Sequence, residues 1–253
     1  MARLIVLGSA AAVSDAEHDN THFALQGEHS VVLVDCGSNP VVNLRRFGIH
    51  HNQLTDMILT HFHPDHVYGV PILLMHMWLL GRRKPLRVYG FHHCLERTED
   101  MMAAFQWDDW PQFFPVAFHR IPEREEQLVL DNPDFRINSW PVKHYGIPTM
   151  GLRIESRASG KIVGYSCDTA PTPNVVRLGY DADLLFHESA GADPAGHSSA
   201  AQAGEIASEA NSKRLVLIHY EVWEKDPTRL LDEARQTYNG PIELAADFSV
   251  YDI

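Results

Sequence analysis

The sequence predicts a layered domain of the α/β or α+β class. Short apolar runs recur along the whole chain, and patterns typical of helices lie between some of them. No internal repeat, low-complexity tract or Ser/Gly linker divides the chain, so residues 1–253 are expected to form a single domain. Strands and helices of this kind bury their apolar faces by packing against one another in layers.

The expected strands are short runs rich in Val, Ile and Leu, which favour extended backbone. They are Leu4–Leu7, Val31–Val34, Met57–Leu59, Leu86–Tyr89, Phe135–Ile137, Met150–Ile154, Lys161–Tyr165, Leu184–Phe186 and Leu215–Ile218.

Patterns typical of helices lie between some of the expected strands and predict five helices. They are Val41–Phe47, Val67–Leu80, Leu95–Phe105, Ala200–Ala210 and Pro227–Gln236. Ser199 followed by Gln202 predicts a capping box at the start of the fourth helix. The apolar stretch Val67–Leu80 is interrupted by Pro71 and His76 and is too short to span a bilayer, so no membrane partner is expected.

The charge balance argues against DNA as a partner. Lys and Arg total 21 against 33 for Asp and Glu, which gives a formal net charge of −12 and no general attraction to a phosphate backbone. The short basic run Arg82-Arg83-Lys84 is interpreted as a solvated turn before a strand. The N-terminus lacks the apolar region of a secretory signal, and the three cysteines are scattered. Both features predict a cytoplasmic protein.

The segment His61-Phe62-His63-Pro64-Asp65-His66 carries the main signal for chemistry. It follows an expected strand, and side chains two apart in an extended segment point the same way, so His61 and His63 can reach one ion. Pro64 ends the strand and precedes a helix, which turns Asp65 and His66 in another direction. Four ligand-type residues are hard to place around one tetrahedral ion, so the spacing favours two ions.

Further ligand candidates lie just past apolar runs, where a strand can aim their side chains. These candidates are His144, Asp168 and His219. The carboxylate of Asp168 can bridge two ions by offering one oxygen to each. Imidazole and carboxylate donors suit zinc, manganese or iron. We expect two divalent cations, with zinc as the first choice and manganese or iron as alternatives.

With these residues the chain resembles the metallo-β-lactamase superfamily. The resemblance implies a four-layer αββα sandwich with the metals between the two sheets. It implies a first ion held by His61, His63 and His144. It implies a second ion held by Asp65, His66 and His219, with Asp168 as the bridge between the two.

Two later segments narrow the resemblance to the ribonuclease Z branch. They are His187-Glu188-Ser189-Ala190 and Gly196-His197-Ser198-Ser199. The resemblance implies that Glu188 orients His197, which then gives a proton to the leaving oxygen of a phosphodiester. Asp65 is expected to orient the attacking water or to take its proton. By the same resemblance, a homodimer is expected.

Departures from that branch bear on the substrate. Ribonuclease Z enzymes carry a long arm that grips precursor tRNA between the third and fourth motifs, and the segment between His144 and Asp168 has no room for it. Gly8-Ser9-Ala10-Ala11-Ala12 stands in place of a glycine-rich turn, and Ser38-Asn39-Pro40 in place of Glu-Gly-Thr. We therefore expect a dinuclear metal-dependent phosphodiesterase that uses a metal-bound hydroxide. Its substrate would be a small or cyclic phosphodiester or an RNA 3′ end.

Other functions stay open. The same metal centre can hydrolyse a lactone, a thioester, a β-lactam or a sulfate ester, although acyl transfer does not call for the pair Glu188 and His197. A di-iron oxidoreductase is disfavoured, because members of that type have Glu at the position of His63. A non-catalytic binding module is disfavoured by the complete ligand set.

Overall fold

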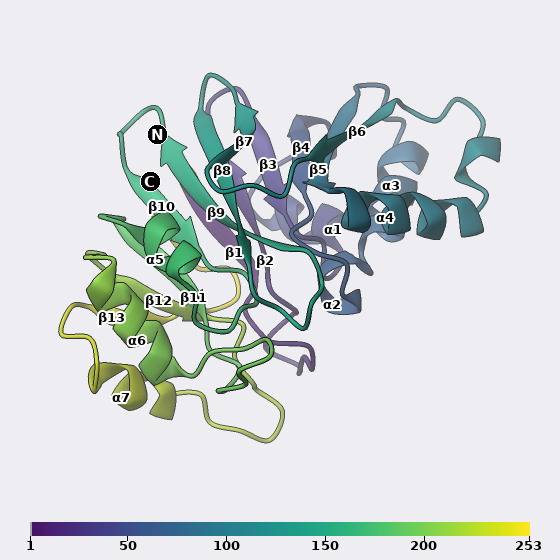
Figure 1. Cartoon of the computed structure of the whole chain (residues 1–253). Coiled ribbons are helices and arrows are strands. Elements are labelled where there is room, and N and C mark those ends of the chain that lie inside the picture. The colour runs from purple at the N-terminus through teal and green to yellow at the C-terminus, as the bar shows by residue number, and fades with distance from the viewer. Residues whose placement is uncertain (1) are drawn as a thin grey trace.

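A computed structural model describes residues 2–253 of the chain. Two seven-stranded sheets pack face to face, and helices cover the outer face of each sheet (Figure 1). The layers therefore run helix, sheet, sheet, helix, which confirms the predicted four-layer αββα sandwich.

The first sheet has the strand order β14-β1-β2-β3-β4-β5-β6. The four strands from β3 to β6 run parallel to one another, and the others pair antiparallel. Its strands are β1 (Arg3–Gly8), β2 (His22–Gln26), β3 (Val31–Val34), β4 (Leu54–Ile58), β5 (Leu86–Phe91), β6 (Val116–Ile121) and β14 (Val250–Asp252).

The second sheet has the strand order β13-β12-β11-β10-β9-β8-β7. The four strands from β10 to β13 run parallel, whereas β7, β8, β9 and β10 pair antiparallel. Its strands are β7 (Gln127–Asp131), β8 (Phe135–Val142), β9 (Thr149–Ser156), β10 (Ile162–Tyr165), β11 (Leu184–Glu188), β12 (Leu215–Ile218) and β13 (Ile242–Leu244).

Each helix lies on the outer face of the sheet whose strands it connects. On the first sheet they are α1 (Pro40–Arg46), α2 (Pro64–Val67), α3 (Val70–Leu79) and α4 (His92–Ala104), with short 3₁₀ turns η1 (His51–Gln53) and η2 (Trp107–Asp109). On the second sheet they are α5 (Pro173–Gly179), α6 (Ala200–Glu209) and α7 (Arg229–Arg235). The capping box that Ser199 and Gln202 predict is present at the start of α6.

The continuous apolar runs in the central strands are explained by burial on both faces. In β1, Leu4 and Val6 join the core between the two sheets, whereas Ile5 and Leu7 join the core under the helices of the first sheet. Alternate side chains of a strand point to opposite faces, so a strand between two layers needs apolar residues at every position. Full burial of each such side chain stabilises the fold by about 1.5–3 kcal/mol.

The expected helix over Val67–Leu80 is wrong in one respect, because the structure divides it into α2 and α3. The break is at Gly69, whose N–H donates to the Cys36 carbonyl at 2.8 Å. A Cβ at this position would lie 2.3 Å from the Ser38 carbonyl oxygen, so only glycine allows this close approach. The contact presses the segment that carries the histidine motif against the end of β3.

The interpretation of Arg82 as part of a solvated turn is also wrong. Its side chain is buried, with 1% of its surface exposed. The guanidinium donates to the carbonyl oxygens of His51, Leu54, Lys84 and Pro85 at 2.7–2.8 Å. Arg82 therefore caps the backbone at the start of β4 and β5.

Among residues 2–253, no helix combines the length and the apolar character needed to cross a bilayer.

Candidate metal centre

The predicted ligands follow the carboxyl ends of strands in both sheets. His61 and His63 follow β4 in the first sheet, whereas His144, Asp168 and His219 follow β8, β10 and β12 in the second. The three ends in the second sheet lie at one edge, because β8, β10 and β12 share one direction. The side chains that follow β4 lie at the same edge, because His61 and His63 form a cluster with His144 and Asp168. Residues distant in the sequence therefore meet where the two sheets face each other.

The first cluster contains three imidazoles and one carboxylate: His61, His63, His144 and Asp168. Nδ1 of His63 lies 3.0 Å from Nε2 of His61 and 2.9 Å from Nε2 of His144. Oδ2 of Asp168 is 3.9 Å from Nε2 of His61 and 3.8 Å from Nε2 of His144. Two nitrogens bound to one zinc ion at about 2.0–2.1 Å are roughly 3.3 Å apart in a tetrahedron, so this cluster has the size of a zinc site.

The second cluster contains Asp65, His66, Asp168 and His219. Nε2 of His66 lies 3.4 Å from both Oδ2 of Asp65 and Oδ2 of Asp168. Nε2 of His219 lies 3.2 Å from the same Asp168 oxygen. Asp168 therefore belongs to both clusters, and its Oδ2 is the oxygen that lies near the ligands of each.

Buried polar atoms of the second cluster lack hydrogen-bond partners within residues 2–253. They include Nε2 of His66 and Oδ1 of Asp168, whose side chains are almost completely buried. A buried polar group without a partner costs about 1–3 kcal/mol, so such atoms are normally satisfied by a bound group. The donor set and these two atoms fit a pair of divalent cations.

In the first cluster, burial favours the neutral imidazole, which is the form that binds metals. It lowers the pKa of His144 to about 4 and the pKa of His61 well below its ordinary value.

In the second cluster, burial lowers the pKa of His66, but the carboxylates of Asp168, Asp65 and Asp35 outweigh it, and the pKa lies well above the ordinary value. For Asp168, burial raises the pKa, but the neighbouring His219 and His66 outweigh it, and the pKa lies well below the ordinary value. The carboxylate is therefore ionised at neutral pH.

Outer contacts fix the orientation of the ligand rings. Oδ2 of Asp35 accepts a hydrogen bond from Nδ1 of His66 at 2.8 Å, and Oδ1 of Asp35 accepts one from the Thr60 N–H at 2.8 Å. Nδ1 of His144 donates to the Gly196 carbonyl oxygen at 2.9 Å. Such contacts set the tautomer and hold the other ring nitrogen toward the metal.

Asp35 is a residue that the sequence analysis missed. It directly follows the apolar run of β3, as the predicted ligands follow their own runs. It adopts φ 60°, and Cys167 and His219 adopt φ 54° and 52° at the ends of two other strands. Left-handed backbone at non-glycine residues costs free energy and concentrates at functional sites, where surrounding contacts hold it.

Glu188 and His197 lie beside both clusters. Oε1 of Glu188 accepts a hydrogen bond from Nδ1 of His197 at 2.9 Å. The His197 ring centroid is 4.9 Å from that of His144 and 5.9 Å from that of His219. The predicted pair is therefore adjacent to the candidate metal centre, with Nε2 of His197 available to a substrate.

The Glu188 carboxylate is buried and anchored by backbone N–H groups. Those of Thr169, Ser198 and Ala190 donate to it at 2.9–3.1 Å. Burial raises the pKa of Glu188 to about 7. Burial lowers the pKa of His197, but the hydrogen bond and the charge of Glu188 outweigh it, and the pKa lies above its ordinary value. The contact with Glu188 therefore favours the protonated form of His197.

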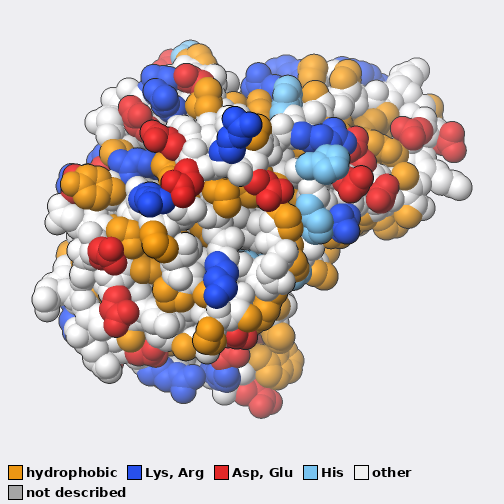
Figure 2. All heavy atoms as spheres, viewed as in Figure 1, with side chains coloured by type: hydrophobic (Ala, Val, Ile, Leu, Met, Phe, Trp, Pro, Cys, Tyr) orange, Lys and Arg blue, Asp and Glu red, His pale blue; other side chains and the backbone are white. Residues whose placement is uncertain are grey.

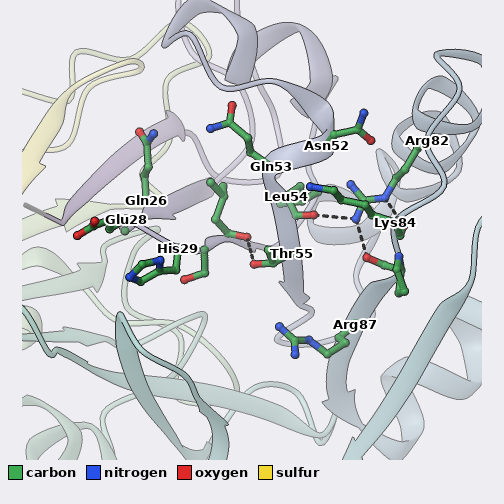
Figure 3. Close-up of a pocket in the computed structure, with 14 residues that line it drawn as sticks. Gln26, Glu28, His29, Asn52, Gln53, Leu54, Thr55, Arg82, Lys84 and Arg87 are labelled. Carbon is green, nitrogen blue, oxygen red and sulfur yellow. Dashed lines mark hydrogen bonds between the residues drawn. The ribbon is translucent and has the colours of Figure 1, made fainter.

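One cavity of the structure adjoins a proposed metal ligand, and a larger one does not. A cavity of about 340 Å³ adjoins His144 and is lined by Phe91, Lys143, Ile147 and Pro148. A pocket of about 590 Å³ lies instead at the amino ends of β4 and β5, at the opposite edge of the first sheet (Figure 3). Both guanidinium groups that line this second pocket are already paired, since Arg82 caps carbonyls and Arg87 binds Asp56 at 2.7 Å.

Comparisons with known proteins identify the family of the chain. The family described as "Beta-lactamase superfamily domain" matches residues 30–220. The ribonuclease Z of Methanothermobacter thermautotrophicus is 28% identical over 305 aligned positions, which cover 98% of this chain and 95% of the relative. The ribonuclease Z of Gemmatimonas aurantiaca is 31% identical and covers 92% of this chain and 90% of the relative. Since the first alignment is longer than the chain, that relative carries residues that this chain lacks.

Solved structures share the fold. The metallo-beta-lactamase fold protein YhfI from Bacillus subtilis has a TM-score of 0.81 at 24% identity, with 99% of this chain and 98% of the other covered. The short form of human tRNase Z has a TM-score of 0.79 at 23% identity, with 99% of each chain covered. The chain belongs to the beta-lactamase superfamily, and within it to the ribonuclease Z-like branch.

Proposed function

We propose that this protein is a dinuclear metal-dependent phosphodiesterase of the ribonuclease Z type. The observation that carries the proposal is the pair of ligand clusters that share Asp168, with His197 and its partner Glu188 directly beside them. Relatives named ribonuclease Z that align over almost the whole chain support it.

The metal ligands follow from the two clusters. His61, His63, His144 and Asp168 would hold one cation, and Asp65, His66, Asp168 and His219 would hold the other. Zinc is the metal that we propose, because imidazole nitrogens dominate the donor set and the nitrogens of the first cluster are spaced as in a tetrahedral zinc site.

When bound, the cations supply a water of lowered pKa and neutralise the charge on the phosphoryl oxygens. Asp65 is suited to orient that water or to take its proton, because its side chain is 12% exposed whereas that of Asp168 is 3% exposed. For Asp65, burial raises the pKa, but His66 outweighs it, and the pKa lies below the ordinary value. Its carboxylate is therefore an acceptor at neutral pH.

His197 would donate a proton to the leaving oxygen. Its Nδ1 is held by Glu188, so Nε2 is the nitrogen that can reach a substrate. An alkoxide is a poor leaving group without a proton, and a positioned acid accelerates its departure by about 10²–10⁴-fold.

The substrate is proposed to be a small or cyclic phosphodiester or an RNA 3′ end. The segment between His144 and Asp168 is occupied by β9, a turn and β10, which leaves no protruding arm there. On the face shown in Figure 2, basic side chains are dispersed among acidic ones. The cavity of about 340 Å³ offers space for a nucleoside-sized group beside His144, one of the proposed ligands.

A substrate panel tests the proposal. It contains bis-p-nitrophenyl phosphate, cyclic nucleotides, precursor tRNA, a lactone and a thioester. Turnover of the phosphodiesters supports the proposal, and turnover of the lactone or thioester alone contradicts it.

His197→Ala tests the role of the proposed acid. It should lower turnover of a phosphodiester with an alkoxide leaving group by about 10²-fold or more and leave the metal content unchanged. The two quantities are measured by initial rates and by elemental analysis. Equal loss of activity and metal, or loss of neither, would contradict the assigned role.

The expected homodimer and the cytoplasmic location stay predictions. Light scattering on the purified protein measures the first, and a monomeric mass would contradict it. Fractionation of cells that produce the protein measures the second.

A further inference from the structure

Tyr145 directly follows the candidate ligand His144 and lies against His197. Its ring centroid is 5.0 Å from that of His144 and 5.5 Å from that of His197. Although it is 47% exposed, its backbone has φ 47°, a left-handed conformation that is costly for an aromatic residue. Surrounding contacts must compensate for this cost.

Those contacts join Tyr145 to the turn of residues 193–197. The Tyr145 N–H donates to the Ala195 carbonyl oxygen at 2.8 Å, and the Tyr145 hydroxyl donates to Oδ2 of Asp193 at 2.6 Å. The His197 N–H donates to the Asp193 carbonyl oxygen at 2.9 Å, so the residue that receives the tyrosine hydroxyl also holds the backbone of His197.

The ring of Tyr145 lies directly on Gly196. A Cβ at Gly196 would be 2.5 Å from Cε2 of Tyr145. The ring therefore packs directly against the backbone of Gly196, next to His197. The same peptide accepts the hydrogen bond from Nδ1 of His144. The turn is thus attached both to a proposed metal ligand and to the tyrosine that follows it.

Glu188 alone does not determine where the His197 ring points. One hydrogen bond at Nδ1 fixes the tautomer but leaves the ring free to turn about that contact and to move with its turn. The edge contact with Tyr145 and the attachment of the turn through Asp193 supply the missing restraints.

We propose that Tyr145 is a positioning residue for His197: its ring and its bond to Asp193 hold the 193–197 turn so that the imidazole faces the leaving oxygen. This inference rests on the proposed function, in which His197 is the acid. It predicts a defect that depends on how much the leaving group needs a proton.

The test compares two phosphodiesters that differ in the leaving group. Bis-p-nitrophenyl phosphate releases a stable phenolate and needs little acid catalysis, whereas a dinucleoside phosphate releases a ribose alkoxide and depends on it. Tyr145→Ala should lower kcat on the dinucleoside phosphate by about 10–100-fold and change kcat on the nitrophenyl ester by less than about threefold. Tyr145→Phe should show a smaller defect of the same kind, because the ring contact remains.

Asp193 variants separate the hydroxyl bond from other effects. Asp193→Ala should show at least the defect of Tyr145→Phe, because it removes the tyrosine bond and also the bond from the Ala195 N–H to Oδ1 of Asp193 at 2.8 Å. Adding Tyr145→Phe to Asp193→Ala should lower the rate no further, because the tyrosine bond is already lost. Asp193→Asn should retain most of the rate, since its amide oxygen can accept from the Ala195 N–H while its amide N–H donates to the tyrosine oxygen. Tyr180→Phe, which alters an exposed tyrosine just past the end of α5, is the matched control and should behave as wild type.

The outcomes separate a failure of the positioning role of Tyr145 from a failure of the proposed function. Equal loss on both substrates in the Tyr145 variants, or no loss on either, overturns the inference, provided that His197→Ala shows the leaving-group dependence. A wild-type protein that turns over neither phosphodiester overturns the proposed function and the inference with it. Elemental analysis of each variant should give the wild-type metal content, and a loss of metal in Tyr145→Phe would also overturn the positioning role.

Discussion

Asp35 fixes the orientation of His66 without lying in either ligand cluster. It is fully buried, and its carboxylate binds both Nδ1 of His66 and the backbone of Thr60. Asp35→Ala should therefore lower the affinity for the second cation by about 10–100-fold, because the imidazole loses the acceptor that sets its tautomer. Titration of the metal-free protein with zinc measures the effect.

Asp35→Asn is the conservative control, since its amide oxygen can still accept from His66. It should lose less affinity than Asp35→Ala. An Asp35→Ala protein that binds zinc as tightly as wild type would show that this contact plays no part in metal binding.

Much of the candidate site was predictable from the sequence at the scale of residues. The histidine motif is dense, and His144, Asp168 and His219 each follow an apolar run, so strand geometry indicated them as candidates. Their assignment to two ions, and the roles of Glu188 and His197, came from the resemblance to a known family.

Asp35 follows an apolar run too, but its partner His66 is far away in the sequence, and nothing in the sequence pairs them. Tyr145 was missed for a similar reason, because its contact with Asp193 depends on how two loops meet.

At the scale of elements, Asp134 ties the two sheets together. It lies in the turn between β7 and β8, and its carboxylate accepts hydrogen bonds from the turn between β2 and β3. These come from Oγ of Ser30 at 2.7 Å, N–H of His29 at 2.9 Å and N–H of Glu28 at 3.1 Å. Burial raises the pKa of Asp134, but these donors outweigh it, and the pKa lies below its ordinary value.

Asp134→Asn should lower the free energy of unfolding by about 2 kcal/mol at pH 7, because an amide group cannot accept all these bonds. The folded-state pKa is depressed, so the carboxylate stabilises the fold above its ordinary pKa of about 3.9 and loses this effect as the pH falls through the folded-state value. The difference between wild type and variant should therefore shrink on acidification below about pH 4. Urea denaturation at several pH values measures it, and a difference independent of pH would contradict the account.

The sequence predicted the central strands better than the edges. Runs such as Val31–Val34 and Leu215–Ile218 are buried on both faces, so their composition alone identifies them. The edge strands β6, β7, β13 and β14 were missed, because many of their side chains are half-buried or exposed and the apolar signal is weak. The interior strand β2 was missed as well, because only three apolar residues lie between His22 and Gln26. The break between α2 and α3 depends on the close approach of Gly69 to the end of β3, which no local pattern reports.

At the scale of the whole molecule, the metal centre and the packing of the two sheets depend on each other. His61, His63, Asp65 and His66 follow a strand of the first sheet, whereas His144, Asp168 and His219 follow strands of the second. Cations that bind this set bind only when the sheets are packed, so they stabilise the folded state by linkage.

The central claim is that two cations are held in common by Asp168. The most direct measurement is the metal content per chain by elemental analysis of dialysed wild type and Asp168→Ala prepared in parallel. The account predicts two zinc ions per wild-type chain and less than one in the variant, because both clusters lose a ligand. A metal-free wild type, or a variant that keeps two ions, would contradict it.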